Sequence, residues 1–182
     1  MKIHPYFFFK VLSKEQIIDF TKKIETKLLN NAKDIPSSHA TKTASVKVVD
    51  GVELWEVSAM LNLINNANLR NFGYDLYSFR NTNFHYNTYD EANQGEYGWH
   101  IDDDTDNPVS DSKLTGIVNL SLDNFEGGEL FINPFGTPIP LVELKDPGTL
   151  VVFPSRYLHK VTPVTKGTRH TGSFWVEGPR FR

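Results

Sequence analysis

The C-terminal part of this 182-residue chain is dominated by short segments in which apolar and polar residues alternate. Such alternation is typical of half-buried β-strands, because successive side chains of a strand point to opposite faces of its sheet. Turn-forming sequences such as Glu126-Gly127-Gly128 and Asp146-Pro147-Gly148 separate the segments. The predicted strands span residues 76–79, 83–89, 97–100, 114–122, 129–132, 139–144, 149–153, 159–163 and 168–177.

The N-terminal part of the chain predicts two helices among shorter elements. The first helix begins at Ser13, with Gln16 three residues later as its capping-box partner. The second is marked by apolar residues at helical spacing, which are Leu54, Val57, Leu61 and Ile64. Residues 6–11 and 46–49 read as strands, and the polar segment 30–45 reads as a loop.

Two helices followed by many short strands favour a mainly β (α+β) fold, in which two sheets form a barrel and helices cover one outer face. No internal repeat, low-complexity tract or linker divides the chain. We therefore expect one domain over residues 1–182. Within it, residues 1–73 would supply the supporting helices and first strands, and residues 74–182 the β-rich core.

Composition excludes several classes of function. The net charge of −3 and the pI near 6.1 argue against a broad basic face, so no nucleic-acid partner is expected. The chain has no cysteine, so any metal must bind to histidine, aspartate or glutamate. No apolar run has the length of a signal-peptide core or a membrane span, which predicts a cytoplasmic protein without a membrane partner. The oligomeric state is left open.

The residues that carry chemistry form a spaced set. His100 and Asp102 follow one another closely at the end of a predicted strand, His159 comes far downstream, and Arg169 lies ten residues after it. Two imidazoles and one carboxylate on one face of a metal leave positions open, as in the facial triad of non-haem Fe(II) oxygenases. A 2-oxo acid and O₂ would occupy those positions. Arg169 suits the remote carboxylate of such an acid, and Thr171 shares its strand face and can add a hydroxyl.

Each of these residues also has a purely structural interpretation. Asp102 belongs to an acidic stretch with Asp103, Asp104 and Asp106, which could be a solvated turn or a loose Ca²⁺ loop. His159 alone could be a hydrogen-bonded core histidine, and Arg169 alone could form a salt bridge. The complete set in this order favours the metal site.

The sequence resembles the PKHD-type hydroxylases among the prolyl-4-hydroxylase-like Fe(II)/2-oxoglutarate dioxygenases. The matching segments include Tyr97-Gly98-Trp99-His100-Ile101-Asp102 and a long stretch around His159 and Arg169. In full they span residues 86–89, 97–102, 125–130, 148–155, 158–169 and 174–175. The resemblance thus covers roughly the C-terminal half of the chain.

The resemblance implies a double-stranded β-helix, which is a jelly roll of the cupin type. It implies Fe(II) on His100, Asp102 and His159, with 2-oxoglutarate held by Arg169. It also implies that Tyr89 lines the 2-oxoglutarate pocket and that Tyr97 and Trp175 flank the metal, although core packing explains these three aromatic residues equally well. Animal prolyl hydroxylases use a tyrosine on the strand after the His-x-Asp turn to hold the co-substrate. Here that strand offers Asn119 or Ser121 instead.

The implied activity is the hydroxylation of a C–H bond with release of succinate and CO₂, using Fe(II), 2-oxoglutarate and O₂, with ascorbate as a further candidate cofactor. The resemblance favours a prolyl residue of a protein or peptide as the substrate. The alternatives are the same chemistry on a free amino acid, another small molecule or a nucleic acid, or a cupin-like binding module without turnover.

Overall fold

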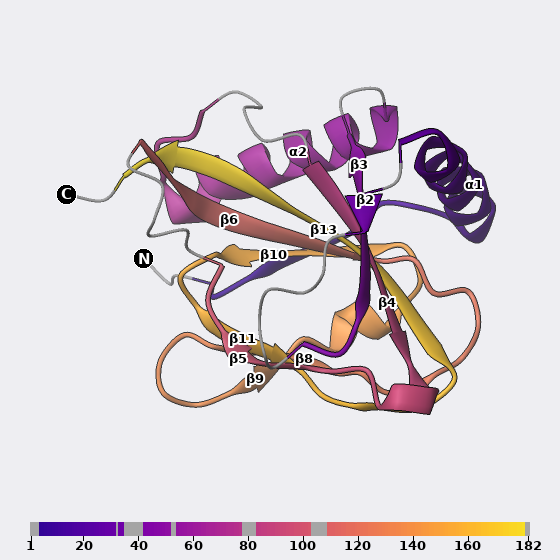
Figure 1. Ribbon diagram of the computed structural model, residues 1–182. Coiled ribbons are helices and arrows are strands. Elements are labelled where there is room, and N and C mark those ends of the chain that lie inside the picture. Colours follow the sequence, from indigo (N-terminus) through magenta and orange to yellow (C-terminus); the bar gives the residue numbers. More distant parts are fainter. Residues whose placement is uncertain are drawn as a thin grey trace.

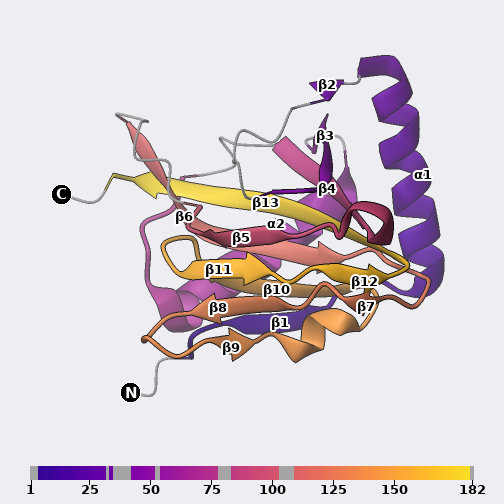
Figure 2. The same cartoon turned by 60° about the horizontal axis from the view of Figure 1, so that its bottom comes forward.

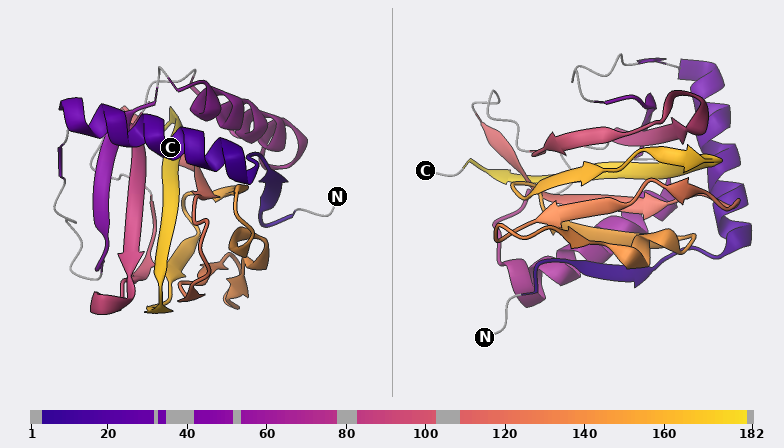
Figure 3. Two further views of the ribbon diagram at one scale, coloured as in Figure 1. Left: turned by 90° about the vertical axis from the view of Figure 1, so that its right-hand side faces the viewer. Right: turned by 90° about the horizontal axis from the view of Figure 1, so that it is seen from below.

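The structure is a computed structural model that describes residues 4–31, 33–34, 42–51, 54–77, 83–102 and 109–180. Two helices, α1 (Lys14–Asn31) and α2 (Trp55–Ala67), cover one face of a seven-stranded sheet, and a four-stranded sheet covers the other face (Figure 1). Figure 3 shows both helices on the same side of the long strands. The predicted barrel of two sheets with helices on one outer face is therefore confirmed, in the form of the double-stranded β-helix that the resemblance implied.

All strand pairs are antiparallel. The larger sheet has the order β1-β10-β6-β13-β4-β3-β2, and the smaller one has the order β5-β11-β8-β9. The larger sheet contains β1 (Phe7–Lys10), β10 (Thr149–Pro154), β6 (Ser110–Asn119), β13 (Thr168–Pro179), β4 (Asn83–Asp90), β3 (Ser45–Asp50) and β2 (Lys33–Asp34). The smaller sheet contains β5 (Tyr97–His100), β11 (Leu158–Val161), β8 (Leu130–Asn133) and β9 (Ile139–Pro140). A separate pair, β12 (Val164–Lys166) and β7 (Glu126–Gly127), lies beside them at one end of the barrel (Figure 2).

The helix termini follow from local chemistry. The backbone N–H of Ser13 donates to Gln16 Oε1 at 2.8 Å, and the N–H of Gln16 donates to Ser13 Oγ at 3.2 Å, which is the predicted capping box. Helix α2 continues into a π-helical turn, η1 (Asn68–Phe72), and ends at Gly73. Gly73 has a φ of 70°, the left-handed conformation in which glycine is least strained. None of the helices in the described ranges combines the length and the apolar character needed to cross a membrane.

The larger sheet separates two hydrophobic clusters. Its strands send alternate side chains toward the helices and toward the smaller sheet. On β13, for example, Phe174 packs in the cluster under the helices, while Arg169 and Trp175 are on the opposite face. The second cluster lies between the sheets and includes Leu130 and Phe153. Polar and charged side chains can therefore line the interior of the barrel without interrupting the cluster under the helices.

Several predicted boundaries differ from the structure. The predicted strand 139–144 ends at Pro140, whose nitrogen cannot donate to a ladder, and the chain then forms a 3₁₀ turn, η3 (Val142–Lys145). The predicted loop 30–45 is wrong at both ends, because α1 runs to Asn31 and β3 begins at Ser45. The segment also contains β2, while residues 32 and 35–41 lie outside the described part. Residues 76 and 77 are not in a strand, and residues 78–79 lie outside the described part.

The remaining differences concern β6 and the smallest strands. Strand β6 begins four residues before the predicted 114–122 and ends three residues before its end. The pair β7 and β12 was not predicted, because two- and three-residue strands are too short to show an alternating pattern. A further 3₁₀ turn, η2 (Glu91–Asn93), follows β4 and leads to the turn before β5.

Gly172 of β13 tests how tightly the cluster under the helices is packed. A Cβ at this position would lie 1.9 Å from Cζ of Phe84, a fully buried ring that stacks on Phe174. We expect Gly172→Ala to lower the free energy of unfolding by about 1–3 kcal/mol, because overpacked cores must shift their neighbours. Chemical denaturation of the wild type and the variant measures this. In the double variant Gly172→Ala/Phe84→Leu the smaller side chain makes room for the methyl group, so its loss should be less than the sum of the single losses. Additive losses would contradict the predicted clash.

Candidate metal centre

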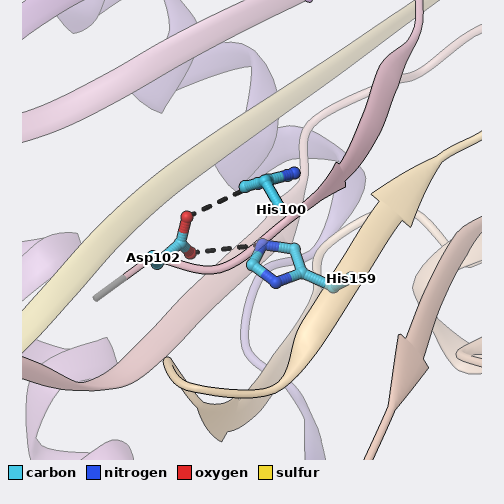
Figure 4. A group of neighbouring side chains, drawn as sticks. All are labelled: His100, Asp102 and His159. Atoms are coloured by element: carbon cyan, nitrogen blue, oxygen red, sulfur yellow. Dashed lines mark ion pairs between the residues drawn. The ribbon is translucent and has the colours of Figure 1, made fainter. Parts of the chain in front are cut away.

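Three potential metal ligands converge between the two sheets. His100 ends β5 and pairs in register with His159 of β11, so both imidazoles project from neighbouring strands into the barrel. Asp102 follows two residues after His100 and turns its carboxylate toward both rings (Figure 4). Its Oδ1 lies 3.5 Å from Nε2 of His100, and its Oδ2 lies 3.3 Å from Nε2 of His159. The ligand atoms of the three residues all lie within 4.8 Å of one another.

The two imidazoles are oriented by the same local contact. Nδ1 of His100 lies 2.8 Å from the carbonyl oxygen of Gly98, and Nδ1 of His159 lies 2.8 Å from that of Tyr157. A carbonyl oxygen only accepts, so each Nδ1 carries the proton and donates it. Nε2 of each ring therefore points to the space beside Asp102, where it can donate to the carboxylate when protonated or bind a metal once the proton has left.

The carboxylate of Asp102 is attached to the larger sheet. Thr115 Oγ1 of β6 donates to Asp102 Oδ2 at 2.8 Å, and the backbone N–H of Asp102 donates to the carbonyl of Ser155 at 3.0 Å. The hydroxyls of Thr115 and Ser155 lie 2.9 Å apart and are both buried. The metal ligands are thus held from both sheets, the imidazoles by the smaller one and the carboxylate by the larger one.

The electrostatics of the three residues favour a cation. Burial works to raise the pKa of Asp102, but His159 and the hydrogen bonds with both imidazoles hold it well below its usual value. Burial would lower the pKa of His159, yet Asp102 raises it. For His100 burial prevails and the pKa is lowered. An ionised carboxylate that faces two imidazole nitrogens attracts positive charge, which protons or a divalent metal can supply.

The donor set fits Fe(II). Two imidazole nitrogens and one carboxylate oxygen form a 2-His-1-carboxylate set, which would leave other coordination positions of a metal open for ligands. The alternative interpretation of the acidic stretch after Asp102 as a solvated turn or a Ca²⁺ loop concerns Asp103, Asp104 and Asp106, which lie outside the described residues.

Arg169 and Tyr89 form a second polar pair inside the barrel. They are register partners on β13 and β4, and both are buried. The guanidinium carbon of Arg169 lies 5.1 Å from the centroid of the Tyr89 ring. Nη2 of Arg169 is buried and makes no hydrogen bond within the described part of the chain. A buried guanidinium nitrogen without an acceptor is costly, and a carboxylate from a ligand would satisfy it.

Tyr97 and Trp175 flank the metal ligands. The ring of Tyr97 stacks on His100 with centroids 3.4 Å apart. Trp175 packs edge to face against His85 at 4.7 Å, and its indole Nε1 is buried without a hydrogen-bond partner among the described residues. Burial, together with the nearby Lys42, lowers the pKa of His85 to about 4, so this imidazole is neutral. Both predicted aromatic residues therefore line the pocket that holds the triad, and so does Tyr89.

Several predicted residues do not line the pocket that holds the triad, and Arg169 lines another cavity, which shares Leu130 with it. Thr171 is buried between Asn87 and Asn119 on the neighbouring strands and does not line the pocket. Asn119 donates to the carbonyl of Lys145 and accepts from the backbone N–H of Ser121. Neither of these two candidate co-substrate donors is among the residues that line the triad pocket. His170 faces α1 instead, where its ring stacks on Tyr86.

Sequence reasoning missed four polar residues of the pocket, which are Lys42, Asn87, Thr115 and Ser173. For two of them the sequence held a signal. Asn87 lies two residues before Tyr89, and Ser173 two residues before Trp175, and residues two apart on a strand share a face. Lys42 and Thr115 join the site through pairings between distant segments, which no local pattern reveals.

Comparison with known proteins agrees with this geometry. The sequence profile of the 2OG-Fe(II) oxygenase superfamily matches residues 84–177, which is about half of the chain. A PKHD-type hydroxylase of Stenotrophomonas maltophilia (strain R551-3) is 39% identical over 90 residues, which cover 46% of this chain and 38% of the relative. Another from Xylella fastidiosa (strain M12) is 38% identical over 105 residues, which cover 50% of this chain and 43% of the relative. The chain thus spans about two fifths of the length of these relatives.

Solved structures share the fold over almost the whole chain. A prolyl-4-hydroxylase of Pseudomonas putida superposes with a TM-score of 0.74 at 17% identity, over 97% of this chain and 94% of the other. A prolyl hydroxylase of Trichoplax adhaerens, solved with a peptide fragment of a hypoxia-inducible factor, superposes with a TM-score of 0.71 at 15% identity, over 94% and 83%. The superfamily takes its name from Fe(II) and 2-oxoglutarate, which fit the triad and the buried guanidinium. This chain belongs to the 2OG-Fe(II) oxygenase superfamily.

Proposed function

We propose that the protein is an Fe(II)- and 2-oxoglutarate-dependent dioxygenase that hydroxylates a prolyl residue of a protein or peptide. One observation carries the proposal, namely the convergence of His100, Asp102 and His159 in a barrel whose inner wall also holds the incompletely bonded guanidinium of Arg169. A metal-binding module without turnover would have no need for this arginine. The overall reaction uses 2-oxoglutarate and O₂, inserts one oxygen atom into the substrate, and releases succinate and CO₂.

Each part of the site has a distinct task in this proposal. When bound to the triad, Fe(II) supplies the activation of O₂ and the cleavage of the C–H bond. The side chains hold the reactants. Arg169 pairs with the far carboxylate of 2-oxoglutarate beside Tyr89, the Nδ1 contacts keep both imidazoles oriented, and Thr115 fixes the carboxylate of Asp102. The cluster between the sheets excludes water from the interior.

The prolyl substrate is supported by the relatives. The similar sequences are PKHD-type hydroxylases, and the structural neighbours include prolyl hydroxylases, one of them solved with a peptide.

We expect the protein to add one oxygen atom to proline-containing synthetic peptides and to release an equal amount of succinate. Mass spectrometry of the peptides and NMR of succinate measure both products in the presence of Fe(II), 2-oxoglutarate and O₂. His159→Ala should abolish both, because the metal loses one of three ligands, while His170→Ala, which replaces a histidine on the opposite face of the sheet, should retain them.

Two negative results have different meanings. Succinate that forms without any oxygen transfer to proline, and equally with peptides in which alanine replaces proline, would overturn the prolyl substrate but keep the enzyme class. A lack of succinate under all conditions, with metal bound, would overturn the dioxygenase itself.

Arg169→Met should weaken the binding of 2-oxoglutarate about 10- to 100-fold, because a charge-assisted pair is worth about 1.5–3 kcal/mol. The apparent KM for 2-oxoglutarate and its dissociation constant from the anaerobic metal-loaded protein both report the loss. Arg156→Met, at an exposed arginine outside the pocket, is the matched control. An unchanged affinity for 2-oxoglutarate in Arg169→Met would show that this arginine is structural.

Thr115→Val preserves the shape of the side chain but removes the hydroxyl that binds Asp102. We expect about a tenfold weaker affinity for Mn(II), measured by calorimetry without turnover, since partners of metal ligands typically contribute 10- to 100-fold. Thr115→Ser, which keeps the hydroxyl, should restore most of the affinity. A folded Thr115→Val protein with wild-type metal affinity would contradict the positioning role.

A further inference from the structure

Lys42 lies in the pocket that holds the metal ligands, although it is far from them in sequence. It precedes β3, and an isolated β-bridge pairs it with Tyr97 of β5. Its Nζ lies 4.8 Å from the centroid of the Tyr97 ring, which itself stacks on His100. Lys42 lines the same pocket as His100, Asp102 and His159. The triad therefore has an ammonium group within its own cavity.

Asn87 holds this ammonium group in place. The Nζ of Lys42 donates to Asn87 Oδ1 at 3.1 Å. The amide nitrogen of Asn87 donates to the carbonyl of His85 and to Ser173 Oγ, both at 3.0 Å. These two bonds determine which way the amide points, so its oxygen faces Lys42. Asn87 is only 1% exposed, so its hydrogen bond with Lys42 is made inside the barrel and not on the protein surface.

The level of Lys42 along the barrel differs from that of Arg169. Asn87 precedes Tyr89, the partner of Arg169, by two residues on the same strand face, which corresponds to about 6.8 Å. In the other direction, Trp175 pairs with Thr115, whose hydroxyl binds Asp102. Asn87 and its lysine thus lie between the level of Arg169 and the level of the metal ligands. Lys42 and Arg169 are therefore two cations at different levels along the barrel interior.

The electrostatic environment of Lys42 suits an anion. Burial lowers its pKa to about 8, Asp102 works to raise it, and Arg169 lowers it further. A ligand with a negative charge beside Nζ would offset the cost of burying the ammonium group.

We propose that Lys42, oriented by Asn87, is an anchor for a carboxylate that lies next to the metal ligands and is distinct from the carboxylate paired with Arg169. The inference rests on the proposed function, because it assumes a 2-oxo acid in the same pocket. Two molecules can supply such a carboxylate. One is 2-oxoglutarate, through the carboxylate beside its keto group. The other is the primary substrate, if it is a free amino acid or carries its target residue at a free C-terminus.

Calorimetric titration of the Mn(II)-loaded protein without O₂ tests the first source. The probes are 2-oxoglutarate and 2-oxobutyrate, which has the same 2-oxo carboxylate but no distal one. If Lys42 binds the 2-oxo carboxylate, Lys42→Met should weaken both probes about tenfold or more, whereas Arg169→Met should weaken only 2-oxoglutarate. Lys42→Arg should keep most of the affinity. Lys160→Met is the control, since this lysine lies over the exposed ring of Trp99 and does not line the pocket.

The second source is tested on the complex of the protein with Mn(II) and 2-oxoglutarate. The probes are L-proline and L-prolinamide, which differ by the carboxylate. If Lys42 binds a substrate carboxylate, the wild type should bind L-proline at least tenfold more tightly than L-prolinamide, and Lys42→Met should lose this preference. The affinity for 2-oxoglutarate should then be the same in Lys42→Met and in the wild type.

The proposal is overturned if Lys42→Met is folded and binds all four probes as the wild type does. That result leaves the proposed function intact as long as wild-type protein binds 2-oxoglutarate in a metal-dependent manner. If the wild type itself does not bind 2-oxoglutarate, the proposed function fails first, and the two failures are therefore distinguishable.

Discussion

The pairing of β5 with β11 is the constraint on which the whole site depends. It places His100 opposite His159, from segments separated by most of the barrel sequence. Side chains alternate along each strand, so a slip of one residue would turn an imidazole to the outer surface. Either Trp99 or Lys160, which contact each other on the outer surface, would take its place. The metal site therefore exists only in one register of one strand pair.

The rest of the molecule secures that register and completes the chemistry. Asp102 is joined to the larger sheet through Thr115 and Ser155, so the triad spans the gap between the two sheets. The apolar cluster around Leu130 and Phe153 fills the space beside it. On the far side of the larger sheet, the helices bury the alternate residues of the same strands. One face of the larger sheet thus contributes polar residues to the site, while its other face packs against the helices.

Sequence patterns could predict the parts of this arrangement that are local or that carry a motif. The capping box of α1 and the strands β4, β5, β10 and β13 follow from neighbouring residues, and the spacing of His100, Asp102, His159 and Arg169 indicated a joint site. Lys42 could not be found in this way, because it reaches the pocket only through a bridge to Tyr97. The predicted strand 139–144 failed for a different reason, since apolar residues there alternate but Pro140 cannot continue a ladder.

The charged side chains of the inner wall indicate what kind of ligand the cavity can bind. Asp102 is the anionic member of the candidate metal site, whereas Lys42 lines the same cavity and Arg169 is buried in the inner wall. With a divalent metal at the triad, these two cations and the metal would together attract anionic ligands to the inner wall. Uncompensated charge is expensive in a buried site. In the proposal the two cations bind different carboxylates, because Asn87, which orients Lys42, lies two residues from the register partner of Arg169. Arg169 would pair with the distal carboxylate of 2-oxoglutarate, and Lys42 with a second carboxylate beside the triad.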